Sequence, residues 1–155
     1  MPEDTSESDQ NYLRLAYEQA LKSYNEGGLP IGSVMVDDNG EVVGFGHNKR
    51  IQENNPILHG EMDCIRNAGP RANYKGVTLY TTLSPCMMCS GTIVQFKIKR
   101  VVIGEDKNFK GNIDFLQKHG VEVVLLADKK CMALMAKFRN QKPEIWLEDI
   151  GEGSS

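Results

Sequence analysis

The chain of 155 residues carries 18 Lys and Arg against 21 Asp and Glu, a formal net charge of −3, and 40% of its residues are hydrophobic. A chain of this length and composition buries enough surface for one stable core, which excludes a disordered protein and a small scaffold that depends on disulfides. Its apolar runs fall short of the ~20 residues of a membrane-spanning helix. We therefore expect no membrane partner. The mild acidity argues against a nucleic-acid partner, since nucleic-acid-binding surfaces usually carry a basic patch.

The first residues are acidic, with neither a basic residue nor an apolar run, and do not resemble a secretory signal or a transit peptide. Residues 1–9 are therefore predicted to be a flexible acidic tail, and residues 10–155 a single domain with a C-terminal lid helix. We expect a cytoplasmic protein, with the nucleus as a second compartment. In such a compartment the cysteines stay reduced, and a close cysteine pair indicates a metal or catalytic site rather than a disulfide.

Periodicity predicts the elements in chain order. Apolar residues at helical spacing predict a helix over 10–25, with Asp9 as its N-cap and Gly27 at its end. Two β-rich runs, 31–36 and 41–45, flank an Asn-Gly turn and predict a hairpin. The rest of the chain alternates, with strands predicted over 77–82, 100–104 and 121–127 and helices over 59–68, 87–96, 113–119, 129–140 and 143–149. This order predicts an α/β fold of three layers (α/β/α), with a mixed sheet of about five strands between helices.

Two short motifs carry the chemistry: His59-Gly60-Glu61, and the later Pro85-Cys86-Met87-Met88-Cys89. H-x-E followed by P-C-x-x-C is the signature of zinc-dependent nucleobase deaminases. Cys86 and Cys89 lie three positions apart, so at the start of a helix they share a face, and a helix N-terminus favours the thiolate that binds zinc. With a His59 nitrogen as third ligand, the fourth tetrahedral position stays open for water, which is typical of a catalytic zinc site.

Glu61 is the candidate acid–base residue, and it can act in this role only if the helix places it beside the metal. Two residues along the middle of a helix point about 200° apart. Glu61 can therefore face the metal beside His59 only if His59 stands at the very start of the helix. In that position Glu61 would carry protons without binding the metal.

Two other interpretations of the cysteine pair remain open at this point. A redox dithiol leaves His59 and Glu61 without a role, and the chain lacks the Trp-Cys-Gly-Pro-Cys sequence of thioredoxins. A closed structural zinc site needs a fourth ligand, and Cys64 is the nearest candidate. We expect Cys64 and Cys131 to be core residues instead. His119 is expected to cap a helix end, and His47 to pack rather than join the site.

Beyond these motifs the chain, from about Asn11 to Glu152, resembles the fungal-type cytosine deaminases of the cytidine/deoxycytidylate deaminase superfamily. The C-terminal block discriminates best, because the wider superfamily lacks it. The segments that carry the resemblance are Tyr24-x-Glu26-Gly27-Gly28-x-Pro30-Ile31-Gly32, Gly46-His47-Asn48, Leu58 to Glu61, Thr78 to Cys86, Gly104-Glu105 with Asn108-Phe109-Lys110, and Glu148 to Glu152.

The resemblance implies a homodimer with one catalytic Zn²⁺ per chain and a role for each matching residue. It implies that His59, Cys86 and Cys89 bind the zinc and that Glu61 is the catalytic proton shuttle. The implied substrate-binding residues are Asn48 and Asp149 at the N1/O2 side of a pyrimidine, the Gly60 N–H near O2, Phe109 and Trp146 over the ring, and Ile31, Leu83 and Ile150 along the pocket.

Chemistry of the pyrimidine agrees with a free base as substrate. A free base keeps an N1–H donor, and leaving that donor buried without an acceptor would cost ~1–3 kcal/mol. Asp149, together with the Asn48 amide oxygen, is expected to accept it, whereas the ribose of a nucleoside would collide with Asp149. Trp146 precedes Asp149 by three residues, so both can face one side of a short helix and close over the pocket.

These observations predict zinc-dependent hydrolytic deamination of free cytosine to uracil and ammonia, a pyrimidine salvage reaction. The alternatives are a deaminase of guanine or cytidine, a tRNA adenosine deaminase and, last, a non-catalytic zinc-stabilised interaction module. Residues 50–57 and 62–73 diverge more from the family than the motifs do, which leaves room for retuning of the pocket.

Overall fold

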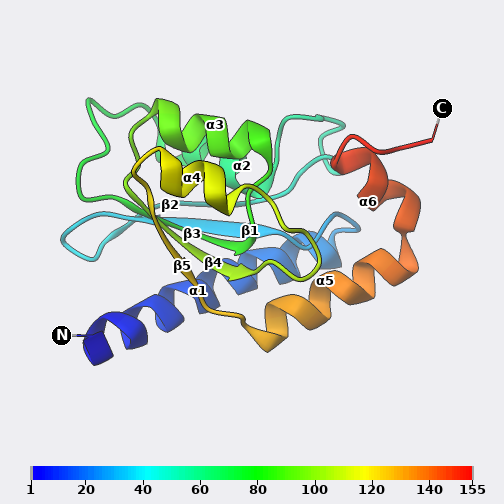
Figure 1. Cartoon of the computed structure of the whole chain (residues 1–155). Helices are drawn as coiled ribbons and strands as arrows, with labels where there is room; N and C mark the ends of the chain where they lie inside the picture. Colours follow the sequence, from blue (N-terminus) through cyan, green and yellow to red (C-terminus); the bar gives the residue numbers. More distant parts are fainter. Residues whose placement is uncertain (1, 155) are drawn as a thin grey trace.

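The computed structural model describes residues 2–154, and in this part of the chain five strands form one mixed sheet in the order β2-β1-β3-β4-β5 (Figure 1). β1 (Gly32–Val36) pairs antiparallel with β2 (Val42–His47) and with β3 (Thr78–Leu83). β4 (Arg100–Glu105) runs parallel to both β3 and β5 (Glu122–Leu125). The predicted hairpin and the mixed sheet are both confirmed.

Helices cover both faces of the sheet, which confirms the predicted three layers. α1 and α5 lie on one face, α2, α3 and α4 on the other, and α6 stands at the end of the sheet (Figure 1). The helices span Pro2–Asn25 (α1), Gly60–Ala68 (α2), Met87–Gln95 (α3), Ile113–Lys118 (α4), Lys129–Gln141 (α5) and Pro143–Asp149 (α6).

Only the start of α1 departs clearly from the predicted elements. The helix begins at Pro2 rather than after Asp9, so residues 2–9 belong to α1 instead of a tail; Met1 lies outside the described residues. Asp9 is 3% exposed and is no N-cap. Its carboxylate accepts hydrogen bonds from Arg100 Nη2 at 2.7 Å and from the Tyr80 hydroxyl at 2.8 Å. Asp9 is thus bound to side chains of the sheet instead of being solvated, and α1 continues on both sides of it.

Apolar side chains fill three clusters around the sheet. The cluster under α2, α3 and α4 contains Cys64, and the one under α1 and α5 contains Cys131, so both cysteines are core residues as predicted. The third cluster lies at the end of the sheet, where α6 packs against β3 and α5; it consists of Leu29, Ile31, Leu83, Met135, Phe138 and Trp146.

These contacts bring the chemistry-bearing segments to one edge. β3 and β4 are parallel, and α3 starts just beyond the C-terminal end of β3. Ligands of α/β proteins bind beyond the carboxyl ends of such strands. Over the described residues, no helix is both long and apolar enough to cross a bilayer.

Candidate active site

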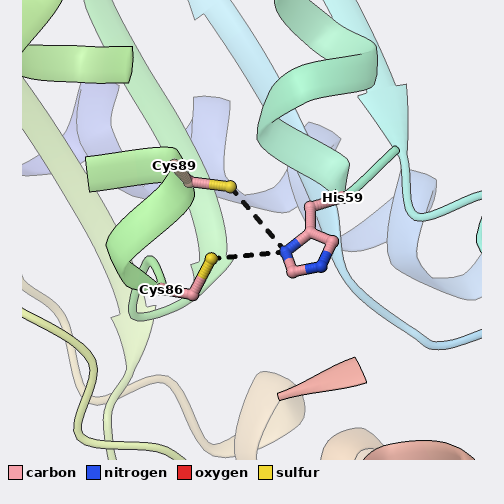
Figure 2. Close-up of side chains that lie close together, drawn as sticks. All are labelled: His59, Cys86 and Cys89. Atoms are coloured by element: carbon pink, nitrogen blue, oxygen red, sulfur yellow. Dashed lines mark hydrogen bonds between the residues drawn. The ribbon is translucent and has the colours of Figure 1, made fainter. Parts of the chain in front are cut away.

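Three predicted metal ligands converge on one point (Figure 2). His59 Nδ1 lies 3.4 Å from Cys86 Sγ and 3.8 Å from Cys89 Sγ. Tetrahedral zinc, with Zn–N about 2.0 Å and Zn–S about 2.3 Å, places such atoms about 3.6 Å apart. The donor set and its spacing therefore fit one zinc ion, and the three ligand atoms lie within 4.8 Å of one another.

Local backbone geometry explains why the three side chains meet. His59 is the N-cap of α2 and Cys86 the N-cap of α3, both in extended conformation with ψ values of 165° and 177°. Neither side chain makes a capping hydrogen bond within the described chain, so both turn toward each other instead. Two helix N-termini thus face the site, and their partial positive charge favours thiolate ligands.

Before a metal binds, one of the three ligands is in the ionisation state that zinc requires, and the other two must each lose a proton. Hydrogen bonds from the Cys89 thiol and from His59 lower the pKa of Cys86 to about 4. The bond shared with Cys86, together with burial, raises the pKa of Cys89. Although burial lowers it, contacts with Asp149 and Cys86 raise the pKa of His59 to about 10. The cysteine pair therefore holds one thiolate before any metal binds.

Glu61 stands in the position that the sequence argument required. Because His59 is the N-cap, Glu61 lies in the first turn of α2, is 3% exposed and lines the same cavity as His59 and Cys86. Burial, followed by the charge of Cys86, raises the pKa of Glu61 to about 7. A carboxyl group with a pKa near neutrality can both take up and release a proton.

On the opposite side of the cavity, Asn48 and Asp149 come together from distant parts of the chain. Asn48 Nδ2 donates to Asp149 Oδ2 at 3.4 Å, and both residues are buried. The Asn48 amide oxygen accepts the backbone N–H of Arg50 at 2.9 Å. That donor can only be an N–H, so the amide oxygen is held on the Arg50 side and the amide nitrogen on the side of Asp149. The Asn48 group that lies beside Asp149 is therefore a donor, whereas the sequence argument assigned the amide oxygen to the ligand.

Asp149 Oδ1 keeps the capacity to accept a hydrogen bond. It lies 3.2 Å from His59 Nε2 and 3.7 Å from Arg50 Nη1, which offset part of the cost of burying a carboxylate. No donor among the described residues is aligned for a hydrogen bond to this buried oxygen. An N–H group of a ligand can therefore still pair with it.

A roof of aromatic and aliphatic side chains closes the cavity. The Phe109 and Trp146 rings meet edge to face, with centroids 5.8 Å apart and planes at 85°. The cavity measures about 20 Å³, so a ring enters only when the roof moves. The structure gathers the predicted lining residues around it: Ile31, Leu83, Phe109, Trp146 and Ile150, next to His59, Glu61, Cys86 and Asp149.

Gly60 brings the start of α2 close to the backbone before β1. A Cβ atom at this position would lie 3.0 Å from the carbonyl oxygen of Ile31, which is tighter than most Cβ contacts. Glycine therefore suits this close approach. Gly60 itself is not among the residues that line the cavity, but its neighbours His59 and Glu61 are.

Sequence reasoning missed two residues at this site. Ser84 lines the cavity, and its hydroxyl donates to the carbonyl of Lys110 at 2.9 Å, which ties down the loop that carries Phe109. Its position just before Pro85 was the available signal. Arg50 contacts both Asn48 and Asp149; its one signal was that it follows Asn48 by two residues.

The other histidines have the structural roles predicted for them. His47 is buried, and its ring nitrogens lie 2.9 Å from Glu26 Oε1 and 3.2 Å from Gln19 Oε1, apart from the metal ligands. His119 ends α4 with Nδ1 2.9 Å from the carbonyl of Phe115. Neither histidine belongs to the metal-binding group.

Relatives of known activity share nearly the whole chain. A cytosine deaminase of Candida albicans is 54% identical over 146 residues, which cover 93% of this chain and 97% of that protein. A tRNA-specific adenosine deaminase of Haemophilus influenzae is 35% identical over 156 residues, covering 92% and 90%. A solved structure from a study of A-to-I editing by tRNA:A34 deaminases at the wobble position of transfer RNA superposes with a TM-score of 0.71. It is 27% identical, and the match covers 81% of this chain and 99% of that one.

The family model of the cytidine and deoxycytidylate deaminase zinc-binding region matches residues 6–105. This range holds all three converging ligands and Glu61. The family match, the relatives that align over most of the chain and the His-Cys-Cys geometry all indicate the same family. The chain belongs to the cytidine and deoxycytidylate deaminase family.

Proposed function

We propose that this protein catalyses the zinc-dependent hydrolysis of free cytosine to uracil and ammonia, a reaction of pyrimidine salvage. The observation that carries the proposal is the buried Oδ1 of Asp149, an acceptor without an aligned donor among the described residues, in the cavity of the metal ligands. A pyrimidine that is free at N1 brings an N–H group to such an acceptor, whereas a pyrimidine nucleoside carries its ribose at that position. The long match to the Candida albicans cytosine deaminase supports the same substrate.

His59, Cys86 and Cys89 would hold the zinc ion. A bound zinc ion supplies Lewis acidity, which lowers the pKa of water toward neutrality. The chain itself contributes a dry surrounding: His59 is 8% and Cys89 1% exposed. Electrostatic interactions are stronger in such a surrounding than in water.

Glu61 would move the protons. It takes one proton from the attacking water and delivers it to ring N3, which makes C4 more electrophilic as the oxygen adds there. Glu61 then takes the remaining proton of the hydroxyl group now bound to C4 and passes it to the amino group. The C4–N bond breaks as the C4 carbonyl forms, so that ammonia leaves and uracil remains. The pKa of about 7 that burial produces supports both directions of transfer at neutral pH.

Asp149, Asn48 and Gly60 would orient the ring. Asp149 accepts N1–H, the Asn48 amide nitrogen donates to O2, and the Gly60 N–H lies near O2. Each pairing leaves a buried group satisfied that would otherwise cost ~1–3 kcal/mol. Phe109 and Trp146 would cover the ring, while Ile31, Leu83 and Ile150 fill the space along its edges.

The lid also argues for a small substrate. Asp149 ends α6 and is 8% exposed, and in the proposed binding mode it would stand where a nucleoside or a tRNA nucleotide carries its ribose. A sugar at N1 would remove the N–H that Asp149 needs and would meet α6. The match to tRNA-specific adenosine deaminases makes tRNA the competing substrate to be tested.

Ammonia release from purified protein of known zinc content tests the proposal directly. Cytosine, cytidine, guanine, adenosine and tRNA are compared at equal enzyme concentration. We expect turnover of cytosine, and at least about a hundredfold lower kcat/KM for the others, because each lacks the N1–H match or collides with the lid. Preferred turnover of cytidine or of tRNA would contradict the proposal.

We also propose that residues 10–155 act as one domain, that the protein is a homodimer and that it works in the cytoplasm, with the nucleus as a second site. The four cysteines are free, as in a reducing compartment. The family resemblance supports the dimer. Sedimentation equilibrium of the zinc-loaded protein tests it, and a single monomeric species at micromolar concentration would contradict it.

A further inference from the structure

Arg50 contacts both residues that face the N1 side of the proposed substrate. Its backbone N–H donates to the Asn48 amide oxygen at 2.9 Å. Its guanidinium lies 3.7 Å from Asp149 Oδ1 and 3.8 Å from Glu148 Oε1, at the end of α6. The backbone of Arg50 therefore contacts Asn48, and its side chain contacts Asp149.

The backbone contact decides what Asn48 presents to the pocket. Because Arg50 N–H occupies the amide oxygen, rotation of the Asn48 amide would leave that N–H facing an NH₂ group. The loop is itself closed by a hydrogen bond from Asn55 N to Arg50 O at 3.1 Å, so the Arg50 backbone is held in place. Asn48 is consequently fixed as a donor toward Asp149 and the ring.

The guanidinium contact acts on the lid. The Asp149 side chain is 2% exposed and that of Arg50 22%, so this pair is shielded from water more than a surface ion pair. Among the described residues, Arg50 is the one Arg or Lys within 4.0 Å of the Asp149 carboxylate. Its second partner, Glu148, adds a contact to the same turn of α6.

The neighbouring residue shows that this placement is specific. Lys49 is equally shielded, with a side chain 21% exposed, and also faces a buried carboxylate. Its ammonium lies 3.4 Å from Asp63 Oδ2 and 3.8 Å from Glu53 Oε2. Adjacent cations in one loop thus pair with different carboxylates, and of the two it is Arg50 that contacts Asp149, a residue that lines the pocket.

From these contacts we propose that Arg50 is a positioning residue: it orients the Asn48 amide and holds the Asp149 end of α6 over the pocket, so that the free base is recognised at N1 and O2. The inference rests on the proposed deamination of cytosine. It also places a specificity role within residues 50–57, one of the segments whose sequence leaves room for retuning of the pocket.

Arg50→Ala, Arg50→Lys and the matched control Lys49→Ala test the role. Arg50→Ala keeps the backbone N–H and so isolates the guanidinium. We expect KM for cytosine to rise about tenfold in Arg50→Ala with kcat changed less than about threefold, since one partly shielded ion pair and its neighbour are lost. Arg50→Lys should recover part of the loss, and Lys49→Ala should leave KM within about twofold.

A second measurement needs no turnover. Trp146 is the single tryptophan of the chain, lies on α6 and is 4% exposed, so acrylamide quenching of its fluorescence reports whether the lid is closed. Arg50→Ala should increase quenching at least about twofold, and Lys49→Ala should not, although both variants lose a comparable ion pair.

The two measurements separate the inference from the proposed function. If Arg50→Ala matches Lys49→Ala in both KM and quenching, the positioning role is wrong. If the unaltered protein fails to deaminate cytosine, the proposed function falls, and the quenching comparison still decides whether Arg50 holds the lid. If circular dichroism shows that Arg50→Ala is unfolded, the KM and the quenching of Arg50→Lys are compared with those of Lys49→Ala instead.

Discussion

The metal corner and the lid border the same cavity but are held in place by different means. The metal corner consists of His59, Cys86 and Cys89 at the first turns of α2 and α3, where extended N-cap residues and the core beneath the helices set each side chain. The lid is α6 with Ile150, and it depends on side chains far away in sequence: Asn48 meets Asp149 across 101 positions.

This difference separates reaction from recognition. The chemistry needs fixed distances between ligands and Glu61, which short backbone-determined turns provide. Recognition needs an element that opens, because the closed cavity measures only about 20 Å³. Polar contacts hold the chain just before the lid, from Tyr24 to Gln141 at 2.7 Å and from Lys142 to the carbonyl of Gly27 at 3.3 Å, while Trp146 anchors α6 in the third cluster.

Breaking the metal corner should have the largest effect. Cys86→Ala removes one of three ligands, so we expect loss of bound zinc and at least about a 10⁴-fold drop in kcat/KM. Metal analysis and ammonia release measure both. The fluorescence of Trp146 should stay that of the closed lid, and one retained equivalent of zinc with normal turnover would disprove the ligand assignment.

Glu61→Gln tests the proton shuttle inside an intact metal corner. The variant keeps the shape of the side chain and should bind zinc normally, while kcat falls about 10³- to 10⁴-fold because no group takes up the proton. Steady-state kinetics with cytosine, together with zinc content, measure this. A kcat near that of the unaltered protein would show that Glu61 is not the proton carrier.

Asp149→Ala changes the lid and leaves the three metal ligands in place. Loss of the N1–H acceptor should lower kcat/KM for cytosine about 10- to 100-fold. Loss of the carboxylate beside His59 Nε2 should also weaken zinc affinity about tenfold or more, measured by competition with a chelator. Assays at saturating zinc separate the two effects, and unchanged cytosine kinetics there would overturn the recognition role.

Asn108→Ala should have the smallest effect, because it loosens the roof without touching the ligands. The Asn108 amide donates to Glu105 Oε1 at 2.8 Å and accepts from Arg139 Nη1 at 3.1 Å, which places the loop of Phe109 beside α6. We expect KM to rise about three- to fivefold with zinc content unchanged. An effect as large as that of Asp149→Ala would mean that the roof, rather than Asp149, dominates binding.

Much of the metal corner was predictable because its determinants are local. Residue spacing identifies the shared face of Cys86 and Cys89, and the position of Glu61 two residues after His59 demands that His59 begin a helix, as it does. The elements behind them follow from periodicity, so the predicted order of helices and strands is confirmed. The resemblance to a known family added the lid residues, which spacing alone does not identify.

The start of α1 shows where this reasoning fails. Residues 1–9 are acidic and were predicted to be a tail, yet Asp9 is buried against Arg100, its partner 91 positions away. Composition cannot reveal that a carboxylate on a helix has a partner when that partner lies on a strand far away in the sequence. The same limitation hid Arg50, whose contacts to Asp149 and Glu148 form only after the chain has folded.

The amino-acid sequence by itself predicted the ligand set, the candidate acid–base residue and the layered α/β fold, because helical spacing, hydrophobic period and ligand chemistry depend on short stretches of chain. Tertiary structure alone decided that the Asn48 amide nitrogen meets Asp149, that Asp149 Oδ1 lies beside His59, and that Arg50 contacts both Asn48 and Asp149. Those properties depend on which donors and acceptors meet across about a hundred residues, and only the folded chain brings them within hydrogen-bond distance.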